Sequence, residues 1–446
     1  MMKSMSKRES IRWIAGRCGR AAGACGVIGW GACLAACAEP ALVPGPAQRE
    51  DPTPAAAFRI DADYPGGNIV VERIQGRTVW VAPDQRDTVP NQWWFYFSFR
   101  LRAPAQTPVA VVFTGRNPLG VRGPAVSIDG GAHWRWMGAG AVRSSRGADG
   151  RPAWSFDAEV PAGASEARYA FCPPYLESHL KAWLDRHRDH PNLAVETLVR
   201  SRAGRPVEML RAGCLDRSRS AGVVIVTSRH HCCEAMATYA LEGCLEAVLA
   251  DDEAGRQWRK AWELVAIPFM DKDGVEAGDQ GKYRAPHDHN RDYIDAPLYP
   301  EVAALMERGR RWGDCVRVFL DLHCPHIRGE WNDRAYFVGS PEPEFWEREK
   351  AFAAVLERVQ EGPIRFRAED CLAYGLAWNR SGNDPAGRSS SAWARSAFPR
   401  AALVASMEIA YADALGIEVN AESARALGRD LGRALAAYLA AAGGGR

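Results

Sequence analysis

The chain lacks a strong excess of charge of either sign. Its 446 residues carry 56 Lys and Arg against 54 Asp and Glu, which gives a formal net charge of +2. Neither a basic surface for nucleic acid nor a polyacidic tail is indicated, so we expect no nucleic-acid partner. With 47% hydrophobic and 25% charged residues, the composition is that of a globular protein long enough for two domains.

The 12 cysteines follow neither a short repeating framework nor paired Cys-x-x-Cys spacings. A zinc ribbon held by thiolates needs such paired spacings, so this class of site is excluded. Internal repeats are also absent from the sequence.

No apolar run near the N-terminus is long enough for a transmembrane helix. Basic residues dominate positions 3–20, and positions 21–36 carry no charge but form a short stretch rich in glycine. This stretch ends in Leu34-Ala35-Ala36-Cys37, which resembles a bacterial lipobox, a motif cleaved before a Cys whose sulfur receives a diacylglycerol. We therefore predict a lipoprotein signal peptide over residues 1–36 and a membrane anchor on Cys37.

The predicted location is the periplasmic face of the outer membrane, because Ala38 gives no inner-membrane retention signal of the Asp type. A plain signal peptide cleaved at an Ala-rich site stays open as an alternative and would give a soluble periplasmic or secreted protein. Eight cysteines follow Cys37, and some of them could pair in an oxidising compartment.

The first part of the exported chain is predicted to be a tether and an all-β domain. Residues 37–57 are rich in Pro and Ala without periodicity, which is typical of a tether. Short alternating or aromatic runs predict a β-sandwich domain over residues 58–164. Its aromatic run Trp93-Trp94-Phe95-Tyr96-Phe97 is interpreted as a core strand, with a ligand platform as the alternative. The expected strands are 68–73, 78–82, 92–102, 109–114, 125–128 and 153–160.

Strands and helices alternate over residues 165–446. This order predicts an α/β fold with a mixed, mostly parallel sheet sandwiched by helices. In such sheets, functional groups gather at the carboxyl ends of the strands. Continuous apolar runs predict strands at 222–227, 264–269, 316–322 and 402–409, and helical patterns cover 235–250, 344–360 and 422–441.

Three metal-ligand candidates lie at the ends of predicted strands. The first strand leads into a His-x-x-Glu motif formed by His231 and Glu234, and the third runs directly into His323. The motif alone is a weak signal, but a turn between a strand and a helix lets both side chains face one point. Two imidazoles and one carboxylate leave a fourth position for water, which is the pattern of a catalytic zinc site with one Zn²⁺.

Glu408 is an acidic residue inside the apolar fourth strand. A carboxylate in that setting costs free energy unless it is paired or functional. It is the candidate general base that takes a proton from a metal-bound water and passes it to a leaving amine. A buried salt bridge or an exposed strand edge is the structural alternative.

A second polar cluster lies between residues 271 and 291. Asn290 and Arg291 offer an amide and a planar guanidinium, which suit a substrate carboxylate. A solvated surface charge is the ordinary alternative for any single arginine. Four surplus histidines are interpreted as supporting or surface residues, or as a replacement for one ligand; they are His230, His287, His289 and His326.

The order of these motifs resembles that of the zinc metallocarboxypeptidases. The branch it resembles is the cytosolic carboxypeptidases, known in eukaryotes as tubulin deglutamylases and deglycylases. That branch places a β-sandwich before the catalytic domain, with an aromatic strand like residues 92–97 and a junction like Phe171-Cys172-Pro173-Pro174-Tyr175. The resemblance covers roughly residues 60–445. The motifs in order are His-x-x-Glu, Asp273-Gly274, Arg284, Asn290-Arg291, Asp321-Leu322-His323 and Glu408.

The resemblance implies a role for each matching residue. His231, Glu234 and His323 would be the zinc ligands, and Glu408 would be the general base and then the general acid. Asp288 would hold a ligating imidazole, Asn290 and Arg291 would hold the terminal carboxylate of the substrate, and Arg284 would stabilise the oxyanion. The branch also implies acidic substrate residues, which Arg388 and Arg395 before Glu408 would bind.

Three departures from the family pattern affect the surroundings of the site. Cys232 and Cys233 replace the usual Pro-Gly inside His-x-x-Glu, and their thiols could compete as ligands or become oxidised. Cys324 replaces the usual Gly after the third ligand. No tyrosine lies between Tyr374 and Tyr411, where relatives place a substrate-capping Tyr, and Trp393 lies there instead.

Three functions compete at this level. The first is an exported carboxypeptidase that acts on the C-termini of peptides or proteins. The second is a peptidase for peptidoglycan stem peptides, which is motivated by the predicted periplasmic location. The third is a catalytically silent scaffold on this fold, against which the presence of every catalytic side-chain type argues.

Overall fold

The computed structural model describes residues 58–443, apart from 88, 90–91, 148 and 383–386. The predicted signal peptide, the tether and the anchor on Cys37 lie outside the described residues. In the part of the chain that is described, no helix combines the length and the hydrophobicity needed to cross a bilayer.

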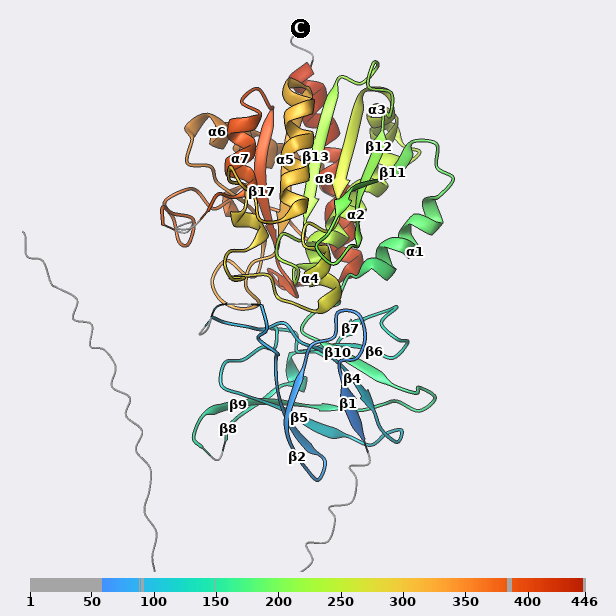
Figure 1. Ribbon diagram of the computed structural model, residues 1–446, viewed down its shortest axis with the longest axis vertical. Helices are drawn as coiled ribbons and strands as arrows, with labels where there is room; N and C mark the ends of the chain where they lie inside the picture. Colours follow the sequence, from blue (N-terminus) through green and yellow to red (C-terminus); the bar gives the residue numbers. More distant parts are fainter. Residues whose placement is uncertain (1–57, 88, 90–91, 148, 383–386, 444–446) are drawn as a thin grey trace, which may run out of the picture. The chain divides into compact units, whose positions relative to one another are not determined.

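Two five-stranded sheets form the β-sandwich, in the orders β1-β4-β10-β6-β7 and β2-β3-β5-β9-β8 (Figure 1). Aromatic rings pack in its core, where the ring centroids of Phe97 and Phe113 are 5.0 Å apart and those of Phe99 and Phe156 are 6.5 Å apart. The strands are β1 (Arg59–Asp61), β2 (Val70–Gln75), β3 (Thr78–Ala82), β4 (Ser98–Arg102), β5 (Val109–Thr114), β6 (Ala125–Ser127), β7 (Arg135–Trp136), β8 (Arg143–Arg146), β9 (Pro152–Ala158) and β10 (Ala167–Ala170).

The strand expected over residues 92–102 is wrong in its first half, because only β4 is a strand. The backbone N–H groups of Phe95 and Tyr96 donate to Oε1 of Gln280, at 2.7 and 3.2 Å, rather than to a neighbouring strand. The four residues after Trp93 are buried, in agreement with their interpretation as core. A distant side chain therefore satisfies backbone groups that the aromatic pattern assigned to a sheet.

A seven-stranded mixed sheet in the order β11-β12-β14-β13-β15-β17-β16 forms the centre of the α/β part. The four neighbouring strands β14, β13, β15 and β17 are parallel to one another. The pairs β11–β12, β12–β14 and β16–β17 are antiparallel. The predicted fold class is confirmed, whereas β11, β12 and β16 were not expected. The strands are β11 (Leu193–Arg200), β12 (Pro206–Gly213), β13 (Gly222–Ser228), β14 (Trp262–Ile267), β15 (Val316–His323), β16 (Ala335–Val338) and β17 (Leu403–Ile409).

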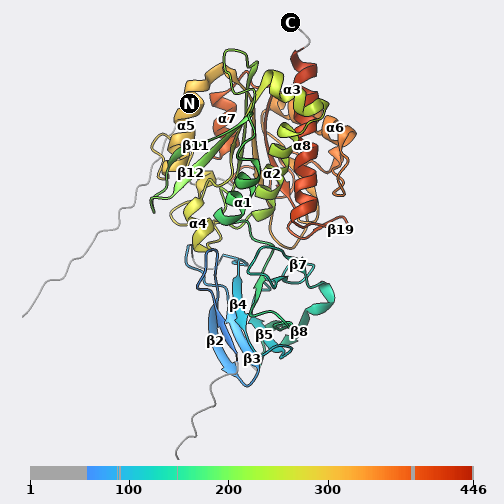
Figure 2. The same ribbon diagram turned by 90° about the vertical axis from the view of Figure 1, so that its right-hand side faces the viewer.

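Helices cover both faces of this sheet, which is why its central strands are continuous apolar runs. Residues of α2, α3, α6 and α8 share one hydrophobic cluster with one set of strand side chains, and α5 and α7 share another with the alternate set. Figure 2 shows the strands between these two layers. The helices are α1 (Glu177–His187), α2 (Ala235–Leu249), α3 (Glu253–Ala261), α4 (Lys272–Ala277), α5 (Pro300–Trp312), α6 (Pro343–Val359), α7 (Ser390–Ala397) and α8 (Ala421–Gly443).

Candidate metal centre

The turn between β13 and α2 positions His231 and Glu234. It is shaped by Arg229, a buried arginine in the left-handed region with a φ of 64°. Its Nε donates to the carbonyl of Cys232 at 2.8 Å, and its Nη1 donates to the carbonyl of Tyr175 at 3.0 Å. These bonds hold a conformation that non-glycine residues rarely adopt.

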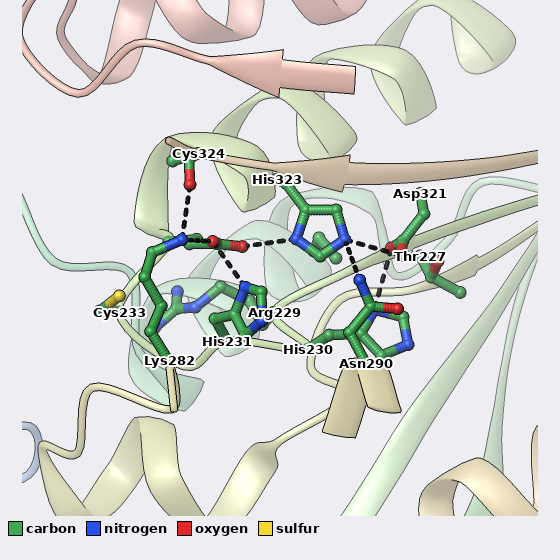
Figure 3. Close-up of polar contacts among 12 residues, drawn as sticks. Thr227, Arg229, His230, His231, Cys233, Lys282, Asn290, Asp321, His323 and Cys324 are labelled. Carbon is green, nitrogen blue, oxygen red and sulfur yellow. Dashed lines mark hydrogen bonds and ion pairs between the residues drawn. The ribbon is translucent and has the colours of Figure 1, made fainter. Parts of the chain in front are cut away.

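The side chains of His231, Glu234 and His323 converge on one point. Figure 3 shows the two histidine rings of this group. The Nδ1 atom of His231 is 2.8 Å from Oε1 of Glu234, and the Nδ1 atom of His323 is 2.8 Å from Oε2. One ligand atom from each residue lies within 4.8 Å of the others. This donor set fits a catalytic zinc ion, for which two imidazole nitrogens and one carboxylate leave a fourth position for water.

The other nitrogen of each imidazole faces a carboxylate. The Nε2 atom of His231 is 3.3 Å from Asp288, and the Nε2 atom of His323 is 2.8 Å from Oδ2 of Asp321. Metal-bound histidines are usually held in this way, which fixes the tautomer and the ring orientation. The two carboxylates therefore keep both Nδ1 atoms turned towards the same point.

Asp321 is the centre of a buried network that sequence reasoning missed. Its Oδ1 accepts a hydrogen bond from Thr227 at 2.8 Å and lies 2.9 Å from Nδ1 of His230, and its Oδ2 also contacts Ser390. His230, Asp321 and His323 form a second group that could hold a metal ion, but these hydrogen bonds already occupy the carboxylate. The signal was available, because residues two apart on a strand share a face.

Asp321→Asn is expected to weaken zinc binding by roughly 10- to 100-fold, which is the usual effect of removing a partner of a ligating histidine. The affinity is measured by competition with a chromophoric chelator. The matched control is Asp430→Asn, which changes another fully buried carboxylate that accepts the N–H groups of Glu361 and Gly362 in the α6–α8 region. An unchanged affinity in Asp321→Asn would contradict the assigned role.

Glu408 lies next to His323 across the β15–β17 ladder, where the two residues are in register. Paired residues of parallel strands point to the same face, so the Glu408 side chain lies on the metal side of the sheet. Its Oε2 atom is buried and has no hydrogen-bond partner among the described residues. Burial raises the pKa of this carboxyl above its usual value, which strengthens it as a proton acceptor.

Arg284 is held by three carboxylates. Its Nη2 atom lies 2.5 Å from Asp271 and 3.2 Å from Asp87, and its Nη1 atom lies 3.0 Å from Asp279. The Nη2 atom also lies 3.5 Å from the thiol of Cys232, on the turn that carries His231 and Glu234. The expected role of Arg284 in binding an oxyanion stays a prediction.

Asn290 and Arg291 lie on the loop between α4 and α5, beside the metal centre. The Nδ2 atom of Asn290 is 3.2 Å from Nε2 of His323, and its Oδ1 accepts the N–H of Ser390 at 2.9 Å. The backbone of Arg388 pairs with that of Arg291, where its N–H donates to the Arg291 carbonyl at 3.1 Å. The structure thus brings these three residues together, and their roles towards substrate stay predictions.

Arg395, which was expected to bind substrate, and Trp393 are both engaged elsewhere. The Nε atom of Arg395 lies 2.7 Å from Glu342, so the guanidinium faces α6. Trp393 is buried against Tyr293, with ring centroids 5.3 Å apart, and packs in the core between α7 and the sheet. A buried indole cannot cap a substrate, so Trp393 does not supply the function of the tyrosine that relatives have in this region.

The cysteines beside the site are buried thiols. Burial raises the pKa of Cys233 to about 12, and it also raises the pKa values of Cys232 and Cys324. Neither candidate metal group among the described residues includes a cysteine, and the eight cysteines there are all free. The thiols therefore lie outside both ligand groups in the described part of the chain.

The remaining surplus histidines have partners outside the ligand set. The Nε2 atom of His287 lies 2.7 Å from Asp292, and the His289 ring stacks on Tyr299 with centroids 3.7 Å apart. His326 stacks on Trp93 with centroids 5.5 Å apart. Supporting roles therefore describe these residues better than replacement of a ligand.

The chain is similar in sequence to cytosolic carboxypeptidases. It is 22% identical to cytosolic carboxypeptidase 6 of Caenorhabditis elegans over 258 residues, which cover 53% of this chain and 56% of that protein. It is 27% identical to cytosolic carboxypeptidase 2 of Xenopus tropicalis over 177 residues, which cover 36% of this chain and 18% of that protein. The matches thus span little more than half of the nematode protein and less than a fifth of the frog protein. No protein-family model matches the chain.

Solved metallo-carboxypeptidases share the fold. The enzyme from Burkholderia cenocepacia superposes with a TM-score of 0.69 at 20% identity, over 86% of this chain and 99% of that chain. The enzyme from Pseudomonas aeruginosa, in complex with (2-guanidinoethylmercapto)succinic acid, gives a TM-score of 0.67 at 22% identity, over 86% and 99% of the two chains. The resemblance to metallocarboxypeptidases of the cytosolic carboxypeptidase branch is thereby confirmed.

Proposed function

We propose that the chain is a zinc-dependent carboxypeptidase that hydrolyses the C-terminal bond of peptides or proteins. One observation carries the proposal: the Nδ1 atoms of His231 and His323 converge with the Glu234 carboxylate, and Glu408 lies beside His323 on the next strand. The similarity to named carboxypeptidases supports it.

Different residues of the chain are assigned to metal binding and to proton transfer. When bound by His231, Glu234 and His323, zinc would polarise the scissile carbonyl and lower the pKa of a water. Glu408 accepts a proton from the attacking water and later donates it to the leaving amine. Its raised pKa favours both transfers, because a carboxyl with a pKa nearer to neutrality can gain and lose a proton at the same pH.

Binding of the terminal carboxylate is assigned to Asn290 and Arg291. They lie on the loop that reaches His323 through the Asn290 amide, at 3.2 Å. A guanidinium binds a carboxylate through charge-assisted hydrogen bonds, and this would restrict cleavage to the last bond of a chain. The branch analogy favours acidic C-terminal residues, with Arg388, whose backbone pairs with that of Arg291, as their candidate partner.

Cleavage assays on short peptides test the function. Peptides ending in Glu, Lys or Phe are compared with their C-terminal amides, and purified muropeptides test the stem-peptide alternative. We expect about one zinc per chain, release of the last residue from free acids, and no cleavage of amides. A clear preference for Lys would contradict the acidic specificity. Release from muropeptides alone would favour the peptidoglycan alternative, and a zinc-free, inactive protein would favour the scaffold.

Arg291→Ala is expected to raise KM for free-acid peptides by roughly 10- to 100-fold, with kcat changed less, because a charge-assisted contact contributes about 1.5–3 kcal/mol. The comparison is made by steady-state kinetics on one peptide. Arg400→Ala is the matched control, because the Arg400 side chain is 79% exposed and forms an ion pair with the exposed Asp314. An unchanged KM in Arg291→Ala would remove this residue from the proposed binding site.

A further inference from the structure

A lysine that the family resemblance does not account for reaches into the candidate metal centre. The Nζ atom of Lys282 contacts Oε1 of Glu234 and donates to the carbonyl of Cys324 at 2.9 Å (Figure 3). Its side chain is only 10% exposed. An ammonium group costs several kcal/mol to bury unless it is paired, so these partners determine its place.

The charge of Lys282 acts on both acidic groups of the site. The Glu234 carboxylate that Lys282 contacts also lies 2.8 Å from the Nδ1 atom of His231 and 2.8 Å from that of His323. Lys282 also opposes the rise in the pKa of Glu408, although less than His323 does. The ammonium is therefore within electrostatic reach of a metal ligand and of the proposed base.

The balance of charge around Arg284 differs from that around Lys282. Its single positive charge faces the carboxylates of Asp87, Asp271 and Asp279, all within 3.2 Å of its guanidinium nitrogens. Even with Arg86, whose Nε lies 4.0 Å from Asp279, the three carboxylates leave this group net negative, so it offers little attraction to a developing oxyanion. Lys282, by contrast, contacts the carboxylate of Glu234, which is a candidate ligand whose charge a metal would share.

We propose that Lys282, rather than Arg284, supplies the fixed positive charge that stabilises the oxyanion during peptide hydrolysis. This inference rests on the carboxypeptidase function proposed above. As the oxygen of water bonds to the carbonyl carbon, the π electrons of the C=O bond move to its oxygen, and a water proton goes to Glu408. The C–N bond then breaks, the C=O bond re-forms, and Glu408 returns the proton to the amine.

The negative charge exists on the carbonyl oxygen only between these two steps. A donor that is already fixed by Cys324 and Glu234 needs no reorganisation when the charge appears, which is the condition for electrostatic catalysis. Removing one such donor usually lowers kcat by about 100- to 1,000-fold. Lys282 therefore qualifies as a catalytic residue and not only as a support for Glu234.

The test compares Lys282→Met and Lys282→Arg with the wild-type holoenzyme. Kinetics give kcat and KM, and calorimetry gives the affinity for a phosphinic peptide, whose tetrahedral phosphorus carries oxygens like those of the intermediate. We expect Lys282→Met to lose about 100-fold or more in kcat and at least about 10-fold in affinity for the phosphinic peptide. Zinc content and KM should change little, and Lys282→Arg should recover part of both losses.

Lys272→Met is the matched control for removing a buried lysine. The Lys272 side chain is fully buried, and its Nζ lies 2.6 Å from Glu208 and 3.0 Å from Glu177, away from the metal ligands. We expect this change to lower the melting temperature of the protein without lowering its affinity for the phosphinic peptide. If Lys282→Met itself fails to fold, Lys282→Arg and Lys282→Gln supply the same comparison.

Two results would overturn the proposal. A Lys282→Met holoenzyme with wild-type kcat and phosphinic affinity would show that the ammonium is not used, and a loss seen only in Arg284→Lys would return the role to Arg284. An inactive wild type that nevertheless binds zinc would instead count against the carboxypeptidase function, so the two failures are distinguishable.

Discussion

Glu408→Gln is expected to lower kcat by about 100-fold or more while the protein keeps its zinc. The amide has the size of the carboxylate but cannot accept the proton of the attacking water, and general-base catalysis contributes about 100- to 10,000-fold. The effect belongs in kcat because Glu408 acts in the two proton transfers and is assigned no part in binding the terminal carboxylate. Single-turnover kinetics on a free-acid peptide, together with metal analysis of the same sample, measure both quantities.

The control for this change is Glu349→Gln, an equivalent substitution of a buried glutamate on α6. Glu349 accepts the N–H of Ser340 at 2.9 Å and is only 1% exposed. Its replacement should alter stability and leave kcat unchanged. Full activity in Glu408→Gln would disprove the assignment of Glu408 as the base and would leave its unpartnered oxygen without an explanation.

His323→Ala is expected to abolish activity by removing one of three metal ligands. Binding of structural zinc releases about 10–16 kcal/mol in total. The loss of one ligand should therefore lower the affinity for zinc by roughly 100-fold or more. His323 also contacts the carboxylates of Glu234 and Asp321, at 2.8 Å each. Without its ring, both carboxylates lose a buried partner, and we expect a lower melting temperature as well.

Metal titration separates the two effects of His323→Ala. The wild type should lose activity when treated with a chelator and regain it with added zinc, whereas the variant should not recover. His133→Ala is the control, because the side chain of His133 is 90% exposed and lies in the β-sandwich. A His323→Ala protein with one tightly bound zinc would show that the metal is held elsewhere, with the His230–Asp321 pair as the next candidate.

The local patterns of the sequence were strong enough to predict the helices and strands that build the site. The ends of α2, α6 and α8 lie within two residues of their expected positions. The strands that carry His323 and Glu408 were predicted at 316–322 and 402–409, and the structure has them as β15 and β17. These elements have regular apolar patterns because the sheet is buried on both faces, so each pattern reports the fold without help from the rest of the chain.

Edge strands and loop conformations were less predictable. The strands β11, β12 and β16 lie at or near the sheet edges, where one side of the backbone or one face is less buried and the apolar pattern is weaker. The segment before β4 has the composition of a strand, but Gln280 takes its backbone donors. In both cases the deciding contact comes from a distant part of the chain.

By itself, the sequence determined the order of the candidate ligands, the candidate base and the fold that brings strand ends together. Only the tertiary structure decided which charged groups meet there. It placed Asp321 behind His323, brought Lys282 to Glu234, and surrounded Arg284 with carboxylates. The physical reason is that burial and charge pairing depend on segments far apart in sequence, whereas periodicity and motif order are local properties.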